Sequence, residues 1–315
     1  MKVAEVLVDG VLVIDKPRDL TSHDVVAVAR RALGERRIGH TGTLDPLATG
    51  VLALACGRAT RLVRFLTASD KEYEATIRFG LTTDSYDVTG EETSRSGLSP
   101  EQEAVERALV ELTGSYLQTP PAFSAKKIAG RRAYEMARAD QVVALTPAPV
   151  TVTRAGLELL EGNVGRVRVA CSAGFYVRAF AHSLGELVGT GACLEALRRT
   201  RSGDFTLENS IGLDRLLDQG VQAAVSALIP LASLLPGFPA VTVASEGRDR
   251  VSHGQEVEGG TPFRRSGRQG DLTAGAASAS APKEWVRVLD NSGHLIAIAR
   301  PGSRPGFLHP AVVLI

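Results

Sequence analysis

A short loop between a helix and an apolar run is the feature that most constrains the fold of this sequence. Residues 36–46 combine glycines, threonines and a proline, which disfavour regular secondary structure and indicate an ordered loop. Before the loop, residues 21–24 have the pattern of a capping box, apolar residues follow at helical spacing, and Gly34 supplies a stop signal. After the loop, residues 51–54 are uniformly apolar. The sequence therefore predicts a helix that leads into a loop of fixed shape.

Asp45 is the one carboxylate in this loop. The glycines before it permit a close approach of the backbone, and Pro46 biases Asp45 towards an extended conformation that fixes the direction of its side chain. A positioned carboxylate can act as a nucleophile or as a general base. An aspartate before a proline also commonly caps a turn, and spacing alone leaves both interpretations open.

Length and composition restrict the class of protein. The 315 residues exceed one ordinary domain, and 44% apolar with 23% charged residues is typical of a globular chain. No apolar run reaches the roughly 20 residues that span a bilayer, and the N-terminal stretch lacks the pattern of a secretory signal, so we expect a cytoplasmic protein. The formal net charge of +1 does not indicate a nucleic-acid partner, so such a partner has to be argued from local clusters of charge.

The pattern of residues up to about 230 is that of an α+β domain. Residues 73–80 alternate apolar with polar side chains and predict a half-buried strand. Residues 167–171 predict a second strand, which leads through a glycine turn into an amphipathic helix that begins at Tyr176. A strand, a turn and a helix in this order form a suitable platform for a site.

The remainder of the chain has the pattern of a β-rich tail. Residues 230–239 contain three prolines and a glycine, which is typical of a linker, and short strands without helical periodicity follow. Residues 264–282 are rich in Gly, Ala, Ser and Arg, and we expect them to form a disordered loop. Residues 285–298 predict a β-hairpin.

The ordered loop resembles the catalytic-aspartate motif of the TruB/dyskerin pseudouridine synthases. Residues 39–52 read G-H-T-G-T-L-D-P-L-A-T-G-V-L and match that motif throughout. Residues 16–22 are similar to the family motif K-P-x-G-x-T-S, except that Asp19 stands in place of its glycine. Residues 174–178 match G-T-Y-I-R, with Phe175 in place of the threonine.

Other segments resemble the family in the same order along the chain. Tyr73 matches the tyrosine that stacks on the target base, and residues 120–134 resemble the segment that grips the T-arm of tRNA. Residues 197–205 are similar to L-R-R-x-x-x-G-x-F. These matches cover roughly residues 11–205, and the C-terminal region resembles the weakly patterned PUA-like domain of bacterial members.

The resemblance implies an α/β (α+β) architecture. This is the pseudouridine synthase fold, with a mixed, mainly antiparallel central sheet, followed by a small C-terminal β-rich PUA-like domain. We expect the catalytic domain to span residues 1–233, with a thumb-like insertion at about 124–150. The PUA-like domain is then expected over residues 236–315.

The activity that the resemblance implies is the isomerisation of a T-loop uridine of tRNA, position 55 by tRNA convention, to pseudouridine. Asp45 is then the essential carboxylate, acting either by covalent attack or by removing a sugar proton. Arg178 is expected to form an ion pair with Asp45 that favours its charged form. A base in a folded loop must be flipped out, and Tyr73 is expected to stack on it, with core packing as the alternative role.

Further residues are expected to bind the substrate. His40 would fill the space that the base leaves, or remain a hydrogen-bonded loop histidine, and Tyr176 would line the site or pack in the core. Lys16 is expected to support the loop. A basic cluster is often only a solvated surface, but several lie in or beside the motifs and would contact phosphates. The expected substrate-binding set is His40, Tyr176, Lys16, Lys126, Lys127, Arg131, Arg198 and Arg199, and a further basic cluster is Arg58, Arg61 and Arg64.

No cofactor or metal is expected. Cys56, Cys171 and Cys193 stand far apart and fit neither a disulfide framework nor a zinc site. The expected partner is the T-arm of tRNA, with no membrane and no obligatory protein partner, and we expect a monomer. Two alternatives remain: a tRNA-folding chaperone with incidental catalysis, and guide-RNA-dependent pseudouridylation of ribosomal RNA.

Overall fold

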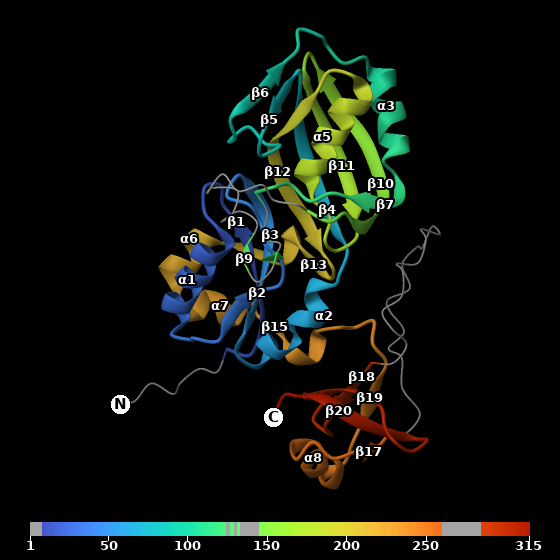
Figure 1. Cartoon of the computed structure of the whole chain (residues 1–315). Coiled ribbons are helices and arrows are strands. Elements are labelled where there is room, and N and C mark those ends of the chain that lie inside the picture. The colour runs from blue at the N-terminus through green and yellow to red at the C-terminus, as the bar shows by residue number, and fades with distance from the viewer. Residues whose placement is uncertain (1–7, 124–126, 129–130, 133–144, 260–284) are drawn as a thin grey trace.

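The computed structural model describes residues 8–123, 127–128, 131–132, 145–259 and 285–315. The chain forms a large mixed sheet flanked by helices and, next to it, a small C-terminal sheet (Figure 1). Within the described ranges, no helix is both long and apolar enough to cross a membrane.

The large sheet has 11 strands and is the frame of the molecule. Its strands are β1 (Gly10–Lys16), β2 (Ile38–His40), β3 (Ala48–Cys56), β4 (Lys71–Phe79), β7 (Gly114–Gln118), β10 (Ala148–Glu161), β11 (Val164–Cys171), β12 (Ala192–Ser202), β13 (Phe205–Thr206), β14 (Ser210–Gly212) and β15 (Ile229–Pro230). The main path runs β14-β1-β3-β12-β4-β11-β10-β7. The pairs β1–β14 and β3–β12 are parallel and the other pairs are antiparallel, so the predicted mixed, mainly antiparallel sheet is confirmed.

The two faces of this sheet differ, as the alternation in β4 shows. Tyr73, Ala75, Ile77 and Phe79 are buried, whereas the side chains between them are half-buried. Because successive side chains of a strand point to opposite faces, the first set belongs to the core and the second faces outward. The predicted strand is therefore confirmed.

Helices flank the sheet, and all but α2 cover its core face. They are α1 (Ser22–Leu33), α2 (Val63–Thr67), α3 (Gln102–Glu111), α5 (Val177–Val188), α6 (Leu213–Gln219) and α7 (Val221–Ala227). Helix α5 packs on β12 and β4, α3 packs on α5 and β10, and α1 packs on β2, α6 and α7 (Figure 1). The apolar side chains of all these helices except α2 form one core with this face of the sheet, whereas those of α2 pack in a second cluster with side chains from the other face of β1 and β3. The 3-10 turns Gly57–Leu62, Leu207–Asn209 and Leu231–Ser233 and the strand pairs β5 (Leu81–Thr83) with β6 (Glu92–Arg95) and β8 (Lys127–Ile128) with β9 (Arg131–Arg132) complete this part.

Helix α1 begins and ends where the sequence predicts. Thr21 and Asp24 form a reciprocal capping box at its start, and Gly34 adopts a left-handed conformation with φ 65° at its end. The chain then enters the loop that carries Asp45, between β2 and β3. The predicted helix followed by an ordered loop is thus confirmed, except that Ile38–His40, expected to be irregular, form β2 and pair with β3.

The C-terminal part is a five-stranded sheet with one helix. Its strands are β16 (Ala240–Thr242), β17 (Val257–Glu258), β18 (Val286–Leu289), β19 (Leu295–Pro301) and β20 (Phe307–Val313), in the order β16-β18-β19-β20-β17. The predicted hairpin is β18 with β19. Helix α8 (Ser245–Ser252) was not predicted, because its sequence is strongly polar and shows little helical periodicity. The segment 264–282 expected to be disordered lies outside the described residues.

The segment predicted to be a linker, residues 230–239, packs as part of a core. Leu231, Leu234 and Leu235 are buried in a cluster that contains side chains of β1 and β3 as well as Leu295 and Leu314 of the C-terminal part. The linker interpretation is therefore corrected: the prolines limit regular structure, but the leucines between them are apolar enough to bury.

The basic cluster of Arg58, Arg61 and Arg64 lies at the junction between the large sheet and the C-terminal part. The Arg58 guanidinium donates to the carboxylate of Asp9 and to the Leu314 carbonyl, and Arg61 donates to the Val313 carbonyl. The Arg64 guanidinium lies 5.2 Å from the centre of the Trp285 ring. These arginines therefore join the two parts of the chain, and the expectation that they also contact RNA phosphates stays a prediction.

Candidate active site

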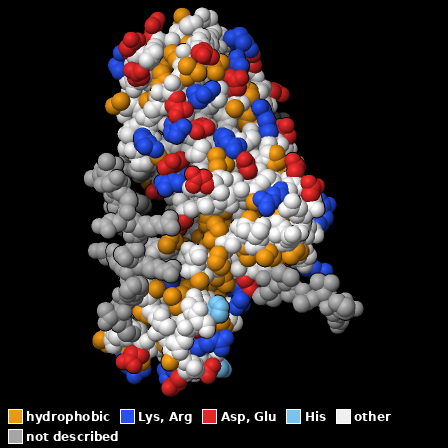
Figure 2. All heavy atoms as spheres, turned by 180° about the vertical axis from the view of Figure 1, so that it is seen from behind, with side chains coloured by type: hydrophobic (Ala, Val, Ile, Leu, Met, Phe, Trp, Pro, Cys, Tyr) orange, Lys and Arg blue, Asp and Glu red, His pale blue; other side chains and the backbone are white. Residues whose placement is uncertain are grey.

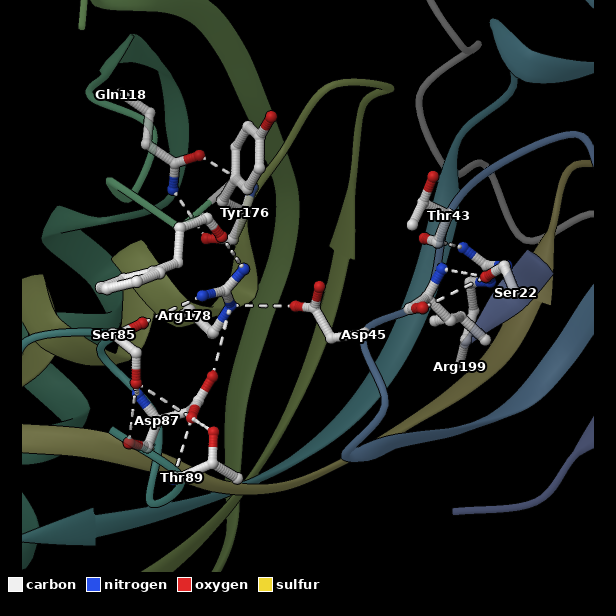
Figure 3. A network of polar contacts seen from close by, with 12 residues as sticks. Ser22, Thr43, Asp45, Ser85, Asp87, Thr89, Gln118, Tyr176, Arg178 and Arg199 are labelled. Carbon is white, nitrogen blue, oxygen red and sulfur yellow. Dashed lines mark hydrogen bonds and ion pairs between the residues drawn. The ribbon is translucent and has the colours of Figure 1, made fainter. Parts of the chain in front are cut away.

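The loop that carries Asp45 is held at five consecutive backbone carbonyls, from residue 42 to residue 46. Arg199 donates to the carbonyls of Gly42 and Thr43 at 3.1 Å and 3.4 Å. The Ser22 hydroxyl donates to the Leu44 carbonyl and accepts from the Leu44 amide. Buried carbonyls need such partners, and here each partner is a fixed group of the scaffold (Figure 3). The shape of the loop therefore depends on residues far from it in sequence.

Lys16 and Asp19 complete this support. The Lys16 ammonium is fully buried and donates to the carbonyls of Pro17 at 2.8 Å, Leu20 at 2.6 Å and Pro46 at 3.4 Å. Burial lowers the pKa of Lys16 to about 8, while the nearby carboxylates, chiefly Asp19, oppose that shift. The geometry agrees with the expectation that Lys16 supports the loop.

Asp19 occupies the position where the family motif has glycine. The conformation of its backbone explains why glycine is usual at this position and why aspartate is tolerated there. Asp19 has φ 68°, in the left-handed region that glycine adopts freely and aspartate adopts more readily than most other residues. Its amide donates to the Pro46 carbonyl at 2.8 Å. The Ala48 amide donates to the Asp45 carbonyl in the same way. The departure from the motif is thus accommodated without a change in the turn.

Asp45 forms the predicted ion pair with Arg178. Oδ2 of Asp45 lies 2.9 Å from Nε of Arg178. The arginine side chain is only 7% exposed, whereas the Asp45 side chain is 39% exposed. The alternative that the Asp45 side chain only caps the following turn is not supported, because its carboxylate points towards Arg178 (Figure 3).

A second carboxylate, Asp87, contacts the same arginine and was missed by the sequence analysis. Its Oδ2 lies 3.6 Å from Nε of Arg178, and the side chain is 7% exposed. Oδ1 accepts from the Ser85 hydroxyl and from the amide and hydroxyl of Thr89. The guanidinium also donates to the carbonyls of Ser85 and Phe123. The sequence signal was the spacing S-x-D-x-T at 85–89, but that spacing is equally typical of an ordinary turn.

Tyr176 is held at its backbone by Gln118. The Gln118 amide oxygen accepts from the Tyr176 amide at 2.8 Å, and its nitrogen donates to the Tyr176 carbonyl at 3.0 Å. This clamp fixes the residue that precedes α5, where the chain turns into the helix. Tyr176 therefore lies within two residues of Arg178 and beside the site (Figure 3).

Tyr73 lies on the core face of β4, opposite Arg199 in the register of β4 with β12. Its side chain is 8% exposed and is part of the main core. Burial raises the pKa of the Tyr73 hydroxyl, and the positive charge of Arg199 opposes that shift. Arg199 is therefore a neighbour of Tyr73 and also holds the loop that carries Asp45.

His40 lies at the start of the same loop, at the end of β2. Its ring packs edge-on against His23 with 5.3 Å between centroids, and its Nδ1 is buried without a hydrogen-bond partner among the described residues. Burial, followed by the charges of His23 and Arg199, lowers the pKa of His40. The ring is therefore neutral near neutral pH.

Arg198 and Arg199 were both expected to bind substrate, and the structure separates them. Arg199 shares the core face with Tyr73 and is 2% exposed, and it donates to two loop carbonyls and to the Val51 carbonyl of β3. Arg198 points to the opposite face, where both of its terminal nitrogens contact the carboxylate of Asp15. Neighbouring residues of a strand face opposite sides, so the burial of Arg199 argues against its expected contact with phosphates. The Arg198 side chain is 38% exposed, and its expected role in substrate binding stays a prediction.

The outward face that carries Arg198 has a row of ion pairs between neighbouring strands. Arg168 contacts both Glu74 and Glu158, and Arg201 contacts Glu72. Figure 2 shows basic and acidic side chains lying side by side over the upper part of this side of the molecule. The face therefore carries balanced charge and not a basic surface.

The remaining predicted binding residues fall in or beside the expected insertion. Lys126 lies outside the described residues. Lys127 and Arg131 belong to the strand pair β8 with β9. The last residues of the expected insertion, 148–150, belong to β10 and pair with β7.

Comparisons with known proteins agree with the resemblance. The model of the TruB family pseudouridylate synthase N-terminal domain matches residues 30–177, and that of the tRNA pseudouridylate synthase B C-terminal domain matches residues 178–235. The chain is 42% identical to the tRNA pseudouridine synthase B of Solibacter usitatus over 310 residues, which cover 97% of this chain and 100% of the relative. It is 40% identical to the protein of the same name from Syntrophus aciditrophicus, over 93% of this chain and 91% of the relative.

Solved structures show the same fold. The structure of an H/ACA ribonucleoprotein bound to a substrate RNA that contains 2'-deoxyuridine has a chain that superposes with a TM-score of 0.71 at 24% identity, over 98% of this chain and 86% of that chain. This likeness bears on the fold alone and confirms the pseudouridine synthase architecture with its C-terminal PUA-like part. The chain belongs to the TruB family of tRNA pseudouridine synthases, which are isomerases.

Proposed function

We propose that this protein converts one uridine in the T-loop of tRNA, position 55, to pseudouridine, with Asp45 as the essential carboxylate. The observation that carries the proposal is the 2.9 Å contact between the exposed Asp45 carboxylate and the buried Arg178 guanidinium. The curated relatives described above are named tRNA pseudouridine synthase B, which supports tRNA as the substrate.

The reaction is an isomerisation whose atoms balance within the nucleotide and water. The C1′–N1 bond of uridine breaks, the uracil rotates, and a C1′–C5 bond forms. C5 then loses its proton to solvent, and N1 carries a proton in the product. Asp45 initiates bond breaking either by attack on a carbon of the nucleoside or by removal of a sugar proton, and both routes require its ionised form.

Arg178 serves this chemistry by orienting the carboxylate. Its Nη1 and Nη2 donate to the carbonyls of Ser85 and Phe123, and Asp87 lies 3.6 Å from the same Nε that contacts Asp45, so the guanidinium is fixed before the substrate arrives. A preorganised cation beside Asp45 favours the charged carboxylate and limits its directions. The loop carbonyls held by Arg199, Ser22 and Lys16 give the same rigidity from the other side.

The target base must leave its stack to reach Asp45, at a cost of a few kcal/mol of lost stacking. We propose that Tyr73 contacts the flipped uracil, since it lies on the same face of the sheet as the loop and is coupled to it through Arg199. His40, with a neutral and partly buried ring, is the candidate that fills the vacated space. Lys126, Lys127 and Arg131 are the candidates that position the T-arm through its phosphates.

The experiment that tests this proposal follows tritium release from tRNA labelled at uridine C5. Purified protein is incubated with an unmodified tRNA transcript, without added metal, nucleotide or protein partner. The matched controls are the Asp45→Asn variant and a transcript with cytidine at the T-loop position. Release by the wild-type protein alone, lost in both controls, is the expected result.

Other outcomes separate the alternatives. Tight binding of tRNA with no release would favour a tRNA-folding chaperone. Release that requires an added guide RNA would favour guide-dependent modification. Release from the cytidine transcript would place the target elsewhere in tRNA and refute the assignment to the T-loop position.

A further inference from the structure

The loop that supplies Asp87 contains a residue with an unusual backbone, Tyr86. Its φ is 63°, in the left-handed region that is disfavoured for a side chain with a Cβ. Ser85 and Asp87 flank it, and both contact Arg178: the Ser85 carbonyl accepts from Nη1 at 3.0 Å, and the Asp87 carboxylate lies 3.6 Å from Nε. The left-handed turn at Tyr86 thus lets the residues on either side face the same guanidinium.

The side chain of Tyr86 stacks on His182. The two rings are nearly parallel, with an interplanar angle of 9° and 4.1 Å between centroids. His182 belongs to α5 and lies one helical turn after Arg178, so the stack joins the loop to the helix that carries the arginine. The Tyr86 carbonyl accepts from the Leu194 amide, and the Val88 amide donates to the Leu194 carbonyl. The backbone of the loop is therefore fastened to β12, and its aromatic side chain is fastened to α5.

We propose that Tyr86 and His182 are positioning residues for the reaction. Their stack holds the segment 85–87 against α5, so that Ser85 and Asp87 fix the Arg178 guanidinium and Arg178 presents Nε to Asp45. Neither residue has a reacting atom in this role, and neither belongs to a motif of the resemblance. This inference rests on the proposed function, because the stack affects the reaction only by positioning Arg178 for its contact with Asp45.

Substitutions at Tyr86 distinguish the stack from the backbone conformation. Tyr86→Phe keeps the ring, Tyr86→Ala removes it, and Tyr86→Gly removes it while relieving the left-handed strain. If the stack positions Arg178, the single-turnover rate on tRNA falls about 10- to 100-fold in both the Ala and the Gly variants, as is typical of a small misplacement of a catalytic group. The Phe variant keeps the wild-type rate, and all three bind tRNA with the wild-type dissociation constant.

Substitutions at His182 test the other ring of the stack, and a variant at Leu109 controls for a general loss of stability. His182→Phe retains a ring for stacking and is expected to be active, whereas His182→Ala is expected to be as slow as Tyr86→Ala. Leu109→Ala on α3 removes a buried side chain that packs in the same core, away from the loop. Its thermal midpoint is expected to fall while its single-turnover rate, measured below that midpoint, stays at the wild-type level.

A measurement without substrate completes the test. Hydrogen exchange at the amides of Val88 and Thr89, which donate to Leu194 and to Asp87, is expected to quicken in Tyr86→Ala and not in Tyr86→Phe. A wild-type rate in Tyr86→Gly, a parallel loss of tRNA binding, or unchanged exchange in Tyr86→Ala would each overturn the inference. An inactive wild-type protein would instead refute the proposed function, and the exchange measurement would still decide whether the stack holds the loop.

Discussion

Arg178 and Asp45 are joined by a 2.9 Å contact between Nε and Oδ2, yet one side chain is 7% exposed and the other 39%. The cation is the buried partner, and it is fixed by Asp87 and by backbone carbonyls before it contacts Asp45. The anion is the partner that a substrate can reach. This asymmetry suits a reaction in which the carboxylate acts and the guanidinium only aims it.

The Arg178→Ala variant should therefore lose rate and not affinity. We expect the single-turnover rate of tritium release to fall about 100-fold or more, since Asp45 loses its orienting partner. The dissociation constant for tRNA, measured by filter binding, should stay near the wild-type value, because a 7% exposed side chain offers little surface to RNA.

The control for this variant is Arg168→Ala, which removes an arginine of the outward face that contacts Glu74 and Glu158. It should change neither the rate nor the affinity. Because Arg178→Ala leaves the buried Asp87 without its cation, a loss of about 3 kcal/mol in unfolding free energy is expected, and rates must be compared where the variant is folded. Equal losses of rate and affinity would contradict the orienting role.

Lys16 should give the rate an alkaline limit. Burial lowers the pKa of Lys16 to about 8, and its ammonium donates to the carbonyls of Pro17, Leu20 and Pro46. As pH rises through about 8 the amine loses one of its three donors, so the loop should loosen and the rate should fall. A pH–rate profile under single-turnover conditions measures this limit.

The contribution of Lys16 to the stability of the protein should change with pH in the direction opposite to the rate. The folded pKa of Lys16, about 8, lies below its ordinary value of 10.5, so between these values the unfolded chain binds the additional proton. The contribution of this group to stability therefore rises with pH in that window. Lys71, which burial also brings to a pKa of about 8, donates to carbonyls of another turn. The alkaline limit should persist in Lys71→Met and disappear in Lys16→Met, and its persistence in Lys16→Met would exclude this origin.

The features that the sequence predicted well are those that depend on interactions between neighbouring residues. The capping box at Thr21, the stop at Gly34 and the alternation of β4 each depend on a few neighbouring residues, and each is found as expected. The Asp45–Arg178 pair was also found, but through resemblance, since no spacing rule brings together residues so far apart in the chain. The positive φ of Asp19 shows that a departure from a motif can preserve the backbone that the motif requires.

What the sequence could not supply was register and tertiary contact. Whether Arg198 or Arg199 faces the core depends on how β12 pairs with β4, which neither strand encodes alone. Asp87 was missed because its partner, Arg178, lies on a distant helix. The leucines of residues 230–239 looked like parts of a linker, since the core that covers them comes from both ends of the chain.

The neighbouring residues Arg198 and Arg199 offer a matched test of their separate roles. Arg199→Met removes the donors to the carbonyls of Gly42, Thr43 and Val51, and should lower the unfolding free energy by about 3 kcal/mol and slow the reaction. Arg198→Met removes a half-exposed pair with Asp15 and should cost less than about 1 kcal/mol.

The salt dependence of tRNA binding then decides whether Arg198 contacts a phosphate. Each lost phosphate contact reduces the slope of log affinity against log salt by roughly 1. The expected role of Arg198 in substrate binding predicts a reduced slope in Arg198→Met. An unchanged slope would contradict that role.

The contact between Phe65 and Trp285 predicts that the two parts of the chain unfold together. The rings lie edge to face with 5.0 Å between centroids, and Trp285 is the single tryptophan of the sequence. Its fluorescence therefore reports on the junction, while far-UV circular dichroism reports on the whole chain. In urea, both signals should show one transition with the same midpoint.

Phe65→Ala tests this coupling while keeping the tryptophan. Phe65 belongs to α2, and its ring packs on both Phe238 and Trp285. Its removal should lower the unfolding free energy by about 3 kcal/mol, and because the junction is a shared apolar core, both midpoints should fall together. Leu217→Ala, which removes a 57% exposed side chain of α6, should move neither midpoint. If the fluorescence midpoint alone fell in Phe65→Ala, the two parts would be independent units and the shared core would contribute little to the stability of the catalytic part.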